Sequence, residues 1–161
     1  MENSLGLITN LSLTAWNTHV SRADKLLNEL SDRQLENEVS PGRNTGVYLL
    51  GHLAAVHDAM LPLLGFGEKH HPELENIFIK NPDKSGLQKP PVSDLRNYWQ
   101  KVNNALNEHF NKVTPEEWLQ KHTSVSEEDF EKEPHRNRLN VLISRTNHLA
   151  SHLGQLLFLN S

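Results

Sequence analysis

Apolar residues recur along most of this chain at steps of three and four residues, which is the spacing of one face of an α-helix. The pattern predicts long helices over residues 4–30, 46–64, 94–113 and 137–160. On the first helix, the predicted inner stripe is Ile8, Leu11, Ala15, His19, Ala23, Leu26 and Leu30. Four long helices without a clear strand pattern predict an all-α protein built as a four-helix bundle.

Helix-start signals support these boundaries. Ser4 opens the first helix, and Thr45 and Ser93 stand where a side-chain oxygen can cap the second and the third. The segments "SDRQ" at 31–34 and "TPEEW" at 114–118 have the pattern of capping boxes. We therefore expect short extra helices in the connections between the long ones.

Two extended connections separate the long helices. Gly65 is placed to end the second helix, and residues 66–92 are irregular apart from one turn of helix expected in "HHPELENIFI". The polar segment 122–137 leads into the last helix. Because 161 residues is the size of one domain and nothing repeats, we expect a single domain over 1–161.

Composition narrows the class of function. The 16 Lys and Arg residues against 20 acidic residues give a net charge of −4 without a basic run, so we expect no binding to nucleic acid. The absence of cysteine excludes disulfides, thiolate metal sites and a cysteine nucleophile. No apolar stretch is long enough for a membrane span and the first residues do not resemble a signal peptide, so we expect a cytoplasmic protein. Histidine is the unusual residue, with ten copies.

The segment "NHLASHLGQLLF" at 147–158 carries His148 and His152 one helical turn apart. Together with Arg145 and Gln155 they form one stripe of the last helix. The adjoining stripe consists of leucines and must face a core, so both imidazoles point at or near the bundle interior. Two buried imidazoles side by side cannot both be charged, and each needs a partner for its ring nitrogens.

A third interior histidine comes from the second long helix, which is apolar on nearly every side. His52 shares its face with Leu49 and Val56. Three imidazoles from two facing helices are suited to hold a divalent metal at about 2.0–2.1 Å, with a position open for water or substrate. His52, His148 and His152 are therefore the predicted metal ligands. The alternative is that each is a hydrogen-bonded core histidine without a metal.

The other histidines are assigned lesser roles. His19 lies on the inner stripe of the first helix and is a reserve ligand, or supports a ligand from behind. His57 lies about 140° round the helix from His52, so we expect it to pack against another helix or a second subunit. A solvated surface position is expected for His70, His71, His109, His122 and His135.

Two polar neighbours of the histidine pair are candidates to assist chemistry. Gln155 is placed to orient a water ligand, or simply faces solvent. Arg145 is placed to meet an anionic substrate, or pairs with a carboxylate elsewhere. No general base stands out, because Asp58 lies on the side of its helix away from His52 and "HLASH" lacks the glutamate of metalloproteases.

The segment "GHLAAVHD", together with the closing "NHLASHLGQLLFL", resembles the DinB/YfiT-like superfamily of metal-dependent enzymes, and the likeness extends over essentially the whole chain. The resemblance implies an up-down-down-up four-helix bundle, often a homodimer, that holds zinc or nickel. By position, the implied ligands are His52, His148 and His152. Some members are transferases or isomerases that depend on a low-molecular-weight thiol. This chain shows no domain beyond the bundle, which argues against the isomerase activity.

The expected function is metal-activated nucleophilic chemistry on a small molecule. A divalent ion on three neutral imidazoles lowers the pKa of a water or binds a thiol as thiolate, so hydrolysis and S-transfer both fit. Only the resemblance favours the thiol. The competing interpretations are a non-catalytic bundle, with a structural ion or merely packed histidines, and a less favoured DNA-binding protein. The apolar character of residues 47–64 on every side favours a homodimer.

Overall fold

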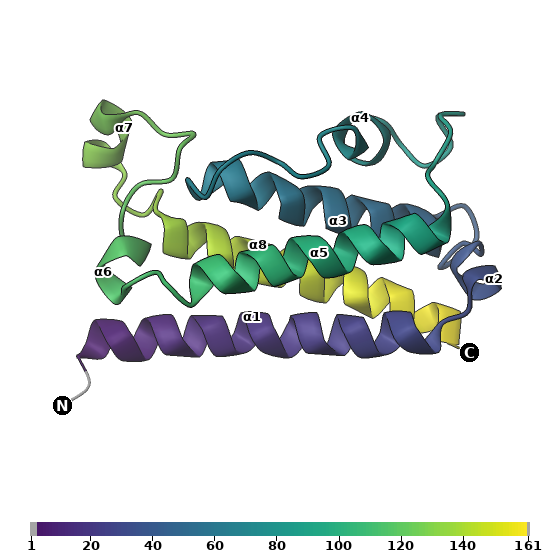
Figure 1. Cartoon of the computed structure of the whole chain (residues 1–161), viewed down its shortest axis with the longest axis horizontal. Coiled ribbons are helices and arrows are strands. Elements are labelled where there is room, and N and C mark those ends of the chain that lie inside the picture. Colours follow the sequence, from purple (N-terminus) through teal and green to yellow (C-terminus); the bar gives the residue numbers. More distant parts are fainter. Residues whose placement is uncertain (1–2, 161) are drawn as a thin grey trace.

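The computed structural model describes residues 3–160, whose regular structure is helical throughout apart from two isolated bridges (Figure 1). The predicted all-α fold is thereby confirmed. The long helices are α1 (Ser4–Glu29), α3 (Gly46–Leu63), α5 (Val92–Phe110) and α8 (Arg138–Leu156). The short helices are α2 (Asp32–Leu35), α4 (Leu74–Phe78), α6 (Pro115–Trp118) and α7 (Glu127–Lys132), and the 3-10 turn η1 (Leu157–Asn160) follows α8.

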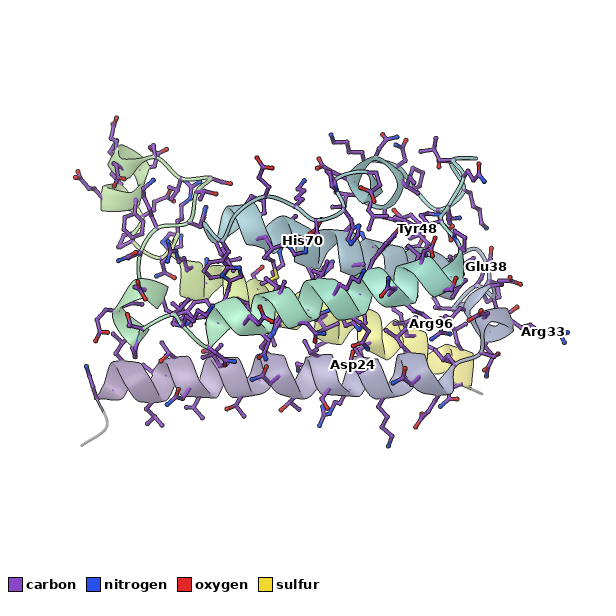
Figure 2. All side chains as sticks on the ribbon, viewed as in Figure 1. Asp24, Arg33, Glu38, Tyr48, His70 and Arg96 are labelled. Carbon is purple, nitrogen blue, oxygen red and sulfur yellow. The ribbon has the colours of Figure 1, made fainter. Side chains whose placement is uncertain are left out.

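The long helices lie side by side in two directions. α1 and α8 run one way along the bundle, and α3 and α5 run the other way (Figure 1). At one end, the side chain of Gln34 donates to the carbonyl of Leu159 at 3.2 Å, and Leu159 packs on Gly46. Arg96 donates to the carbonyl of Leu30 at 2.7 Å (Figure 2). The C-terminal ends of α1 and α8 therefore meet the N-terminal ends of α3 and α5.

α3 is buried on nearly every side. It packs against α4, α5 and α8, and Leu49, Leu50 and Leu53 are inaccessible to solvent. Burial within one chain explains the uniformly apolar sequence, so this feature does not by itself require a second subunit. Gly51 lets α4 approach, because a methyl group at that position would overlap the ring of Phe78.

The first half of α1 differs from the predicted inner stripe. Ile8 and Leu11 are 50% and 62% exposed, and Ala15 is exposed as well, whereas Trp16 is buried. A tryptophan buries far more apolar surface than an alanine, so α1 turns Trp16 toward the core. From Ala23 onward the predicted apolar positions are buried.

The capping signals at Ser31, Thr45 and Thr114 are confirmed. Each side chain accepts a hydrogen bond from the backbone N–H three residues further on, and Ser31 and Thr114 form complete capping boxes. These caps fix the starts of α2, α3 and α6. The start of α3 matters most for function, because it sets which of its residues face α8.

α5 begins and ends earlier than predicted. Its N-cap is Pro91 rather than Ser93, because a proline supplies the extended backbone before a helix without a side-chain cap. It ends at Phe110 rather than near Val113, because the chain must become extended again before the proline that opens α6. α7 was not predicted, although Ser126 followed by three acidic residues is a helix-start signal.

The connection after α3 agrees with the prediction. Gly65 has a φ of 76°, the left-handed conformation expected of a residue that ends a helix, and the expected turn of helix is α4. Within residues 3–160, no helix combines the length and the apolar character that a membrane span requires.

Candidate metal centre

Three imidazoles from α3 and α8 converge on one point in the bundle. Nε2 of His148 lies 3.1 Å from Nε2 of His52 and 3.1 Å from Nε2 of His152. The three candidate ligand atoms lie within 4.8 Å of one another, and all three side chains are half-buried. The structure therefore brings together the three residues that the sequence selected.

The spacing of the three nitrogens fits a single ion. A metal–nitrogen distance of about 2.0–2.1 Å places neighbouring ligand atoms about 2.9 Å apart around an octahedral ion and about 3.4 Å apart around a tetrahedral one. The two separations that involve Nε2 of His148, both 3.1 Å, fall between these values, and all three ligand atoms lie within 4.8 Å of one another. Imidazole nitrogen suits zinc and nickel equally, so the donor atoms favour a first-row divalent ion without choosing between the two.

Two of the rings are fixed through their second nitrogen. Nδ1 of His52 donates to the carbonyl of Phe78 at 2.7 Å, and Nδ1 of His152 donates to Oε1 of Gln155 at 2.7 Å. A neutral imidazole with its proton on Nδ1 carries a lone pair on Nε2. Both rings are therefore held in the tautomer that binds a metal, supported in the way usual for metal-ligating histidines.

This arrangement leaves His148 with a conflict that a cation resolves. Its Nε2 faces lone pairs of both His52 and His152, but it has one hydrogen at most to donate. Without a cation, this single hydrogen cannot fully satisfy both lone pairs, which is unfavourable in a half-buried site. A cation that accepts all three lone pairs removes the conflict. The residues present therefore fit a bound divalent metal.

Burial favours the neutral form of two of the three histidines. It is the main cause that lowers the pKa of His148 to about 4, with further lowering by the charges of His152, His52 and Arg145. Burial also lowers the pKa of His52, although the hydrogen bond to Phe78 opposes it. Because metals bind neutral imidazole, His148 and His52 need not lose a proton at neutral pH before they bind an ion.

Tyr48 supports His52 and was not selected from the sequence. Its ring stacks on the imidazole with centroids 6.1 Å apart and planes 10° apart, and its hydroxyl donates to the carbonyl of Asn81 at 2.6 Å (Figure 2). Burial raises the pKa of Tyr48, so the phenol keeps its proton at neutral pH. The only signal in the sequence is the four-residue spacing between Tyr48 and His52, which places them on one helix face.

His57 and His19 lie outside the cluster. The ring of His57 is buried between Trp16 and Trp99, with centroid distances of 4.7 and 4.9 Å, and its Nδ1 donates to Oδ1 of Asn103 at 2.8 Å. The prediction that His57 packs against another helix is confirmed. His19 is half-buried and its Nδ1 has no hydrogen-bond partner, but it does not join the three-histidine group.

Two histidines expected at the surface instead pack on aromatic rings. The ring centroid of His71 lies 3.9 Å from that of Tyr98, and the ring of His109 stacks on Phe66 at 4.6 Å. The aromatic partners lie far away in the sequence, so the polar context did not reveal this packing. His122 is half-buried, while the residues exposed as predicted are His70 and His135.

Asp58 has a structural role. Its buried carboxylate accepts hydrogen bonds from the backbone N–H groups of His70 and His71, both at 2.8 Å, and so holds the connection after α3 against that helix. It lies outside the cluster, which agrees with its predicted position on the helix. Among the described residues, no Asp or Glu belongs to the three-histidine group.

The two expected helpers lie beside the cluster on α8. Gln155 is exposed, and it accepts a hydrogen bond from Nδ1 of His152, so it orients a candidate ligand side chain. Its role toward a water ligand stays a prediction. Arg145 is half-buried one helical turn before His148, and its charge lowers the pKa of both His52 and His148. The alternative role for Arg145, a pair with a carboxylate, is absent from the ion pairs within residues 3–160.

The fold and the site together define a helical bundle with a histidine-only candidate metal centre. The family model of the DinB superfamily matches residues 15–156, a range that contains all three histidines of the centre. The chain therefore belongs to the DinB superfamily, as its resemblance to that family predicted. None of the curated proteins matches the chain.

Proposed function

We propose that this protein is a metal-dependent enzyme in which His52, His148 and His152 hold one zinc or nickel ion. The convergence of three Nε2 atoms, two of them in rings already fixed in the metal-binding tautomer, carries the proposal. Membership of the DinB superfamily supports it. When bound, a divalent ion on neutral ligands supplies Lewis acidity that activates a nucleophile at neutral pH.

The protein's own contribution is to hold and orient the ligands. Phe78 and Gln155 keep the protons of His52 and His152 on Nδ1, and the stacked ring of Tyr48 limits rotation of His52. Ligands held in one geometry lose little entropy when they bind, which favours a site prepared for chemistry.

The nucleophile that we favour is a low-molecular-weight thiol, which would make the protein an S-transferase. The chain contains no cysteine, so the sulfur has to come from a small molecule. The group of ligand residues contains no carboxylate to act as a general base for water, whereas a thiol that binds a metal is deprotonated outright. Hydrolysis is the second candidate, because an ion on three imidazoles also acidifies water.

The decisive test combines metal content with activity. Untagged wild type, His148→Ala and the exposed control His135→Ala are exchanged into zinc or nickel, and bound metal is measured by elemental analysis. We expect about one ion per chain in the wild type and the control, and less than a tenth of that in His148→Ala. Equal metal content in all three proteins would show that the three histidines do not bind the metal and only pack in the bundle.

The same samples distinguish the nucleophiles. An aryl chloride with added cysteine reports thioether formation with release of chloride, and 4-nitrophenyl acetate reports hydrolysis. We expect metal-dependent thioether formation that His148→Ala loses. Circular dichroism melts of these variants test the non-catalytic alternative, because a purely structural ion would leave a metal-free variant unfolded while a catalytic one would not.

A further inference from the structure

Arg145 is a half-buried cation that has no acidic partner among residues 3–160. It lies on α8 one helical turn before His148, and its Nε is buried without a hydrogen-bond partner. Arg96, by comparison, pairs with Asp32. Because an unpaired guanidinium is costly to remove from water, the position of Arg145 needs a reason other than stability.

The charge of Arg145 acts on the interior of the bundle. It lowers the pKa of His57, which lies on α3. Burial lowers the pKa of Arg145 itself, but a guanidinium keeps its proton at neutral pH. Because Arg145 lies one helical turn before His148, the cation stands beside the candidate metal centre.

A divalent ion on the three histidines adds two positive charges to this region. Buried charge is tolerated when an opposite charge compensates it. The described residues supply none here, because no Asp or Glu among them belongs to the ligand group and none forms an ion pair with Arg145. A bound anion can supply the negative charge that the described residues lack.

We infer that the substrate of this site is an oxyanion, a small molecule whose carboxylate or phosphate group binds Arg145 while its reactive part lies at the three histidines. The inference rests on the proposed function and names its substrate class. A guanidinium suits this task, because its planar fork donates two parallel hydrogen bonds to carboxylate or phosphate oxygens. Arg145 and His148 lie three residues apart on one helix stripe, so one small molecule can reach both.

The test uses the full chain loaded with Co²⁺, whose visible absorption changes when its surroundings change. Wild type, Arg145→Gln, Arg145→Lys and Arg33→Gln are titrated with acetate, inorganic phosphate and neutral acetamide. Arg33 is the matched control, because it is exposed and points away from the bundle (Figure 2). We expect acetate or phosphate to change the spectrum of the wild type, whereas acetamide does not. The anion that binds distinguishes a carboxylate from a phosphate substrate.

In Arg145→Gln, the dissociation constant of that anion should rise at least about tenfold, while Arg33→Gln behaves as wild type. The affinity for Co²⁺ should stay equal or increase, because a repelling charge has been removed. Arg145→Lys keeps the positive charge but lacks the planar guanidinium, so its anion dissociation constant should lie between those of the wild type and Arg145→Gln. A merely structural arginine would not produce opposite changes in anion and metal affinity.

Equal anion dissociation constants in the wild type and Arg145→Gln would overturn the inference. If Arg145→Gln does not fold, Arg145→Leu replaces it as the uncharged variant. An anion dissociation constant equal to that of the wild type would again overturn the inference. Failure of the proposed function appears separately, as the absence of Co²⁺ absorption in the wild type before any anion is added.

Discussion

At the scale of single residues, the candidate centre depends on what lies behind each imidazole. His52 and His152 have their Nδ1 protons placed by Phe78 and Gln155, whereas Nδ1 of His148 is buried without a partner. His57 is different again, because it is sealed in the core and cannot reach the cluster through its hydrogen-bonded nitrogen. Identical side chains therefore serve as candidate ligand or as core residue according to their second contact.

His57 makes stability depend on pH in a predictable direction. Burial lowers its pKa to about 3 in the folded protein, against an ordinary value of 6.5. Below pH 6.5 the imidazole of His57 becomes protonated in the unfolded chain, whereas in the folded protein it stays neutral down to about pH 3. The free energy of unfolding should therefore fall as the pH drops through this window, by up to about 1.4 kcal/mol per pH unit for one proton.

Urea unfolding of metal-free protein at pH 7, 6 and 5 measures this effect. His57→Gln cannot take up this proton. The slope of its unfolding free energy against pH should therefore be smaller than that of the wild type, by up to about 1.4 kcal/mol per pH unit. His135→Gln is the exposed control and should keep the wild-type slope. Parallel curves for the wild type and His57→Gln would show that His57 does not control the acid sensitivity.

At the scale of elements, the docking of α4 on α3 links the fold to the site. Gly51 provides the space that the ring of Phe78 occupies, and the carbonyl of Phe78 orients His52. Gly51→Ala should force α4 away, with a loss of about 1–3 kcal/mol in stability, as is typical of overpacking, and weaker metal binding. Thermal melts and metal titrations measure both effects.

Gly154→Ala is the matched control for this substitution. Gly154 also lies in a long helix, but a methyl group there would meet nothing within 4 Å. Alanine favours a helix over glycine by roughly 0.5–1 kcal/mol, so this variant should be slightly more stable than the wild type. Equal stability of Gly51→Ala and Gly154→Ala would contradict the proposed role of close α3–α4 packing.

At the scale of the whole molecule, the homodimer expected from the sequence can be tested on one surface. α1 and α8 share a groove without charged residues, lined by Leu11, Ser12, Ala15, Ile143, Thr146 and Asn147. Leu11 and Ile143 are 62% and 42% exposed. An uncharged apolar surface can meet its own copy across a two-fold axis without charge repulsion.

Sedimentation of the wild type should give the mass of two chains, and Leu11→Glu should reduce it to that of one chain by placing a charge in the contact. Leu119→Glu is the control, because Leu119 is 41% exposed and lies outside the groove. A wild type that sediments as one chain at micromolar concentration would show that the predicted homodimer is wrong.

The sequence by itself determined the existence of the four long helices and the candidate ligands, because both follow from local rules. Helical periodicity and caps such as Thr45 act within a few residues, and the spacing of His148 and His152 places them on one face of any helix. Burial of His52 followed from the apolar residues around it. These features need no knowledge of which elements become neighbours.

Only the tertiary structure decided which contacts surround those ligands. Three such contacts join segments distant in sequence: the packing of His71 on Tyr98, the turn of Trp16 rather than Ala15 into the core, and the carbonyl of Phe78 behind His52. Such contacts depend on how helices pack, and no local pattern encodes them. The absence of an acidic partner for Arg145 within residues 3–160 belongs to the same class, because it depends on how segments distant in sequence are packed around that side chain.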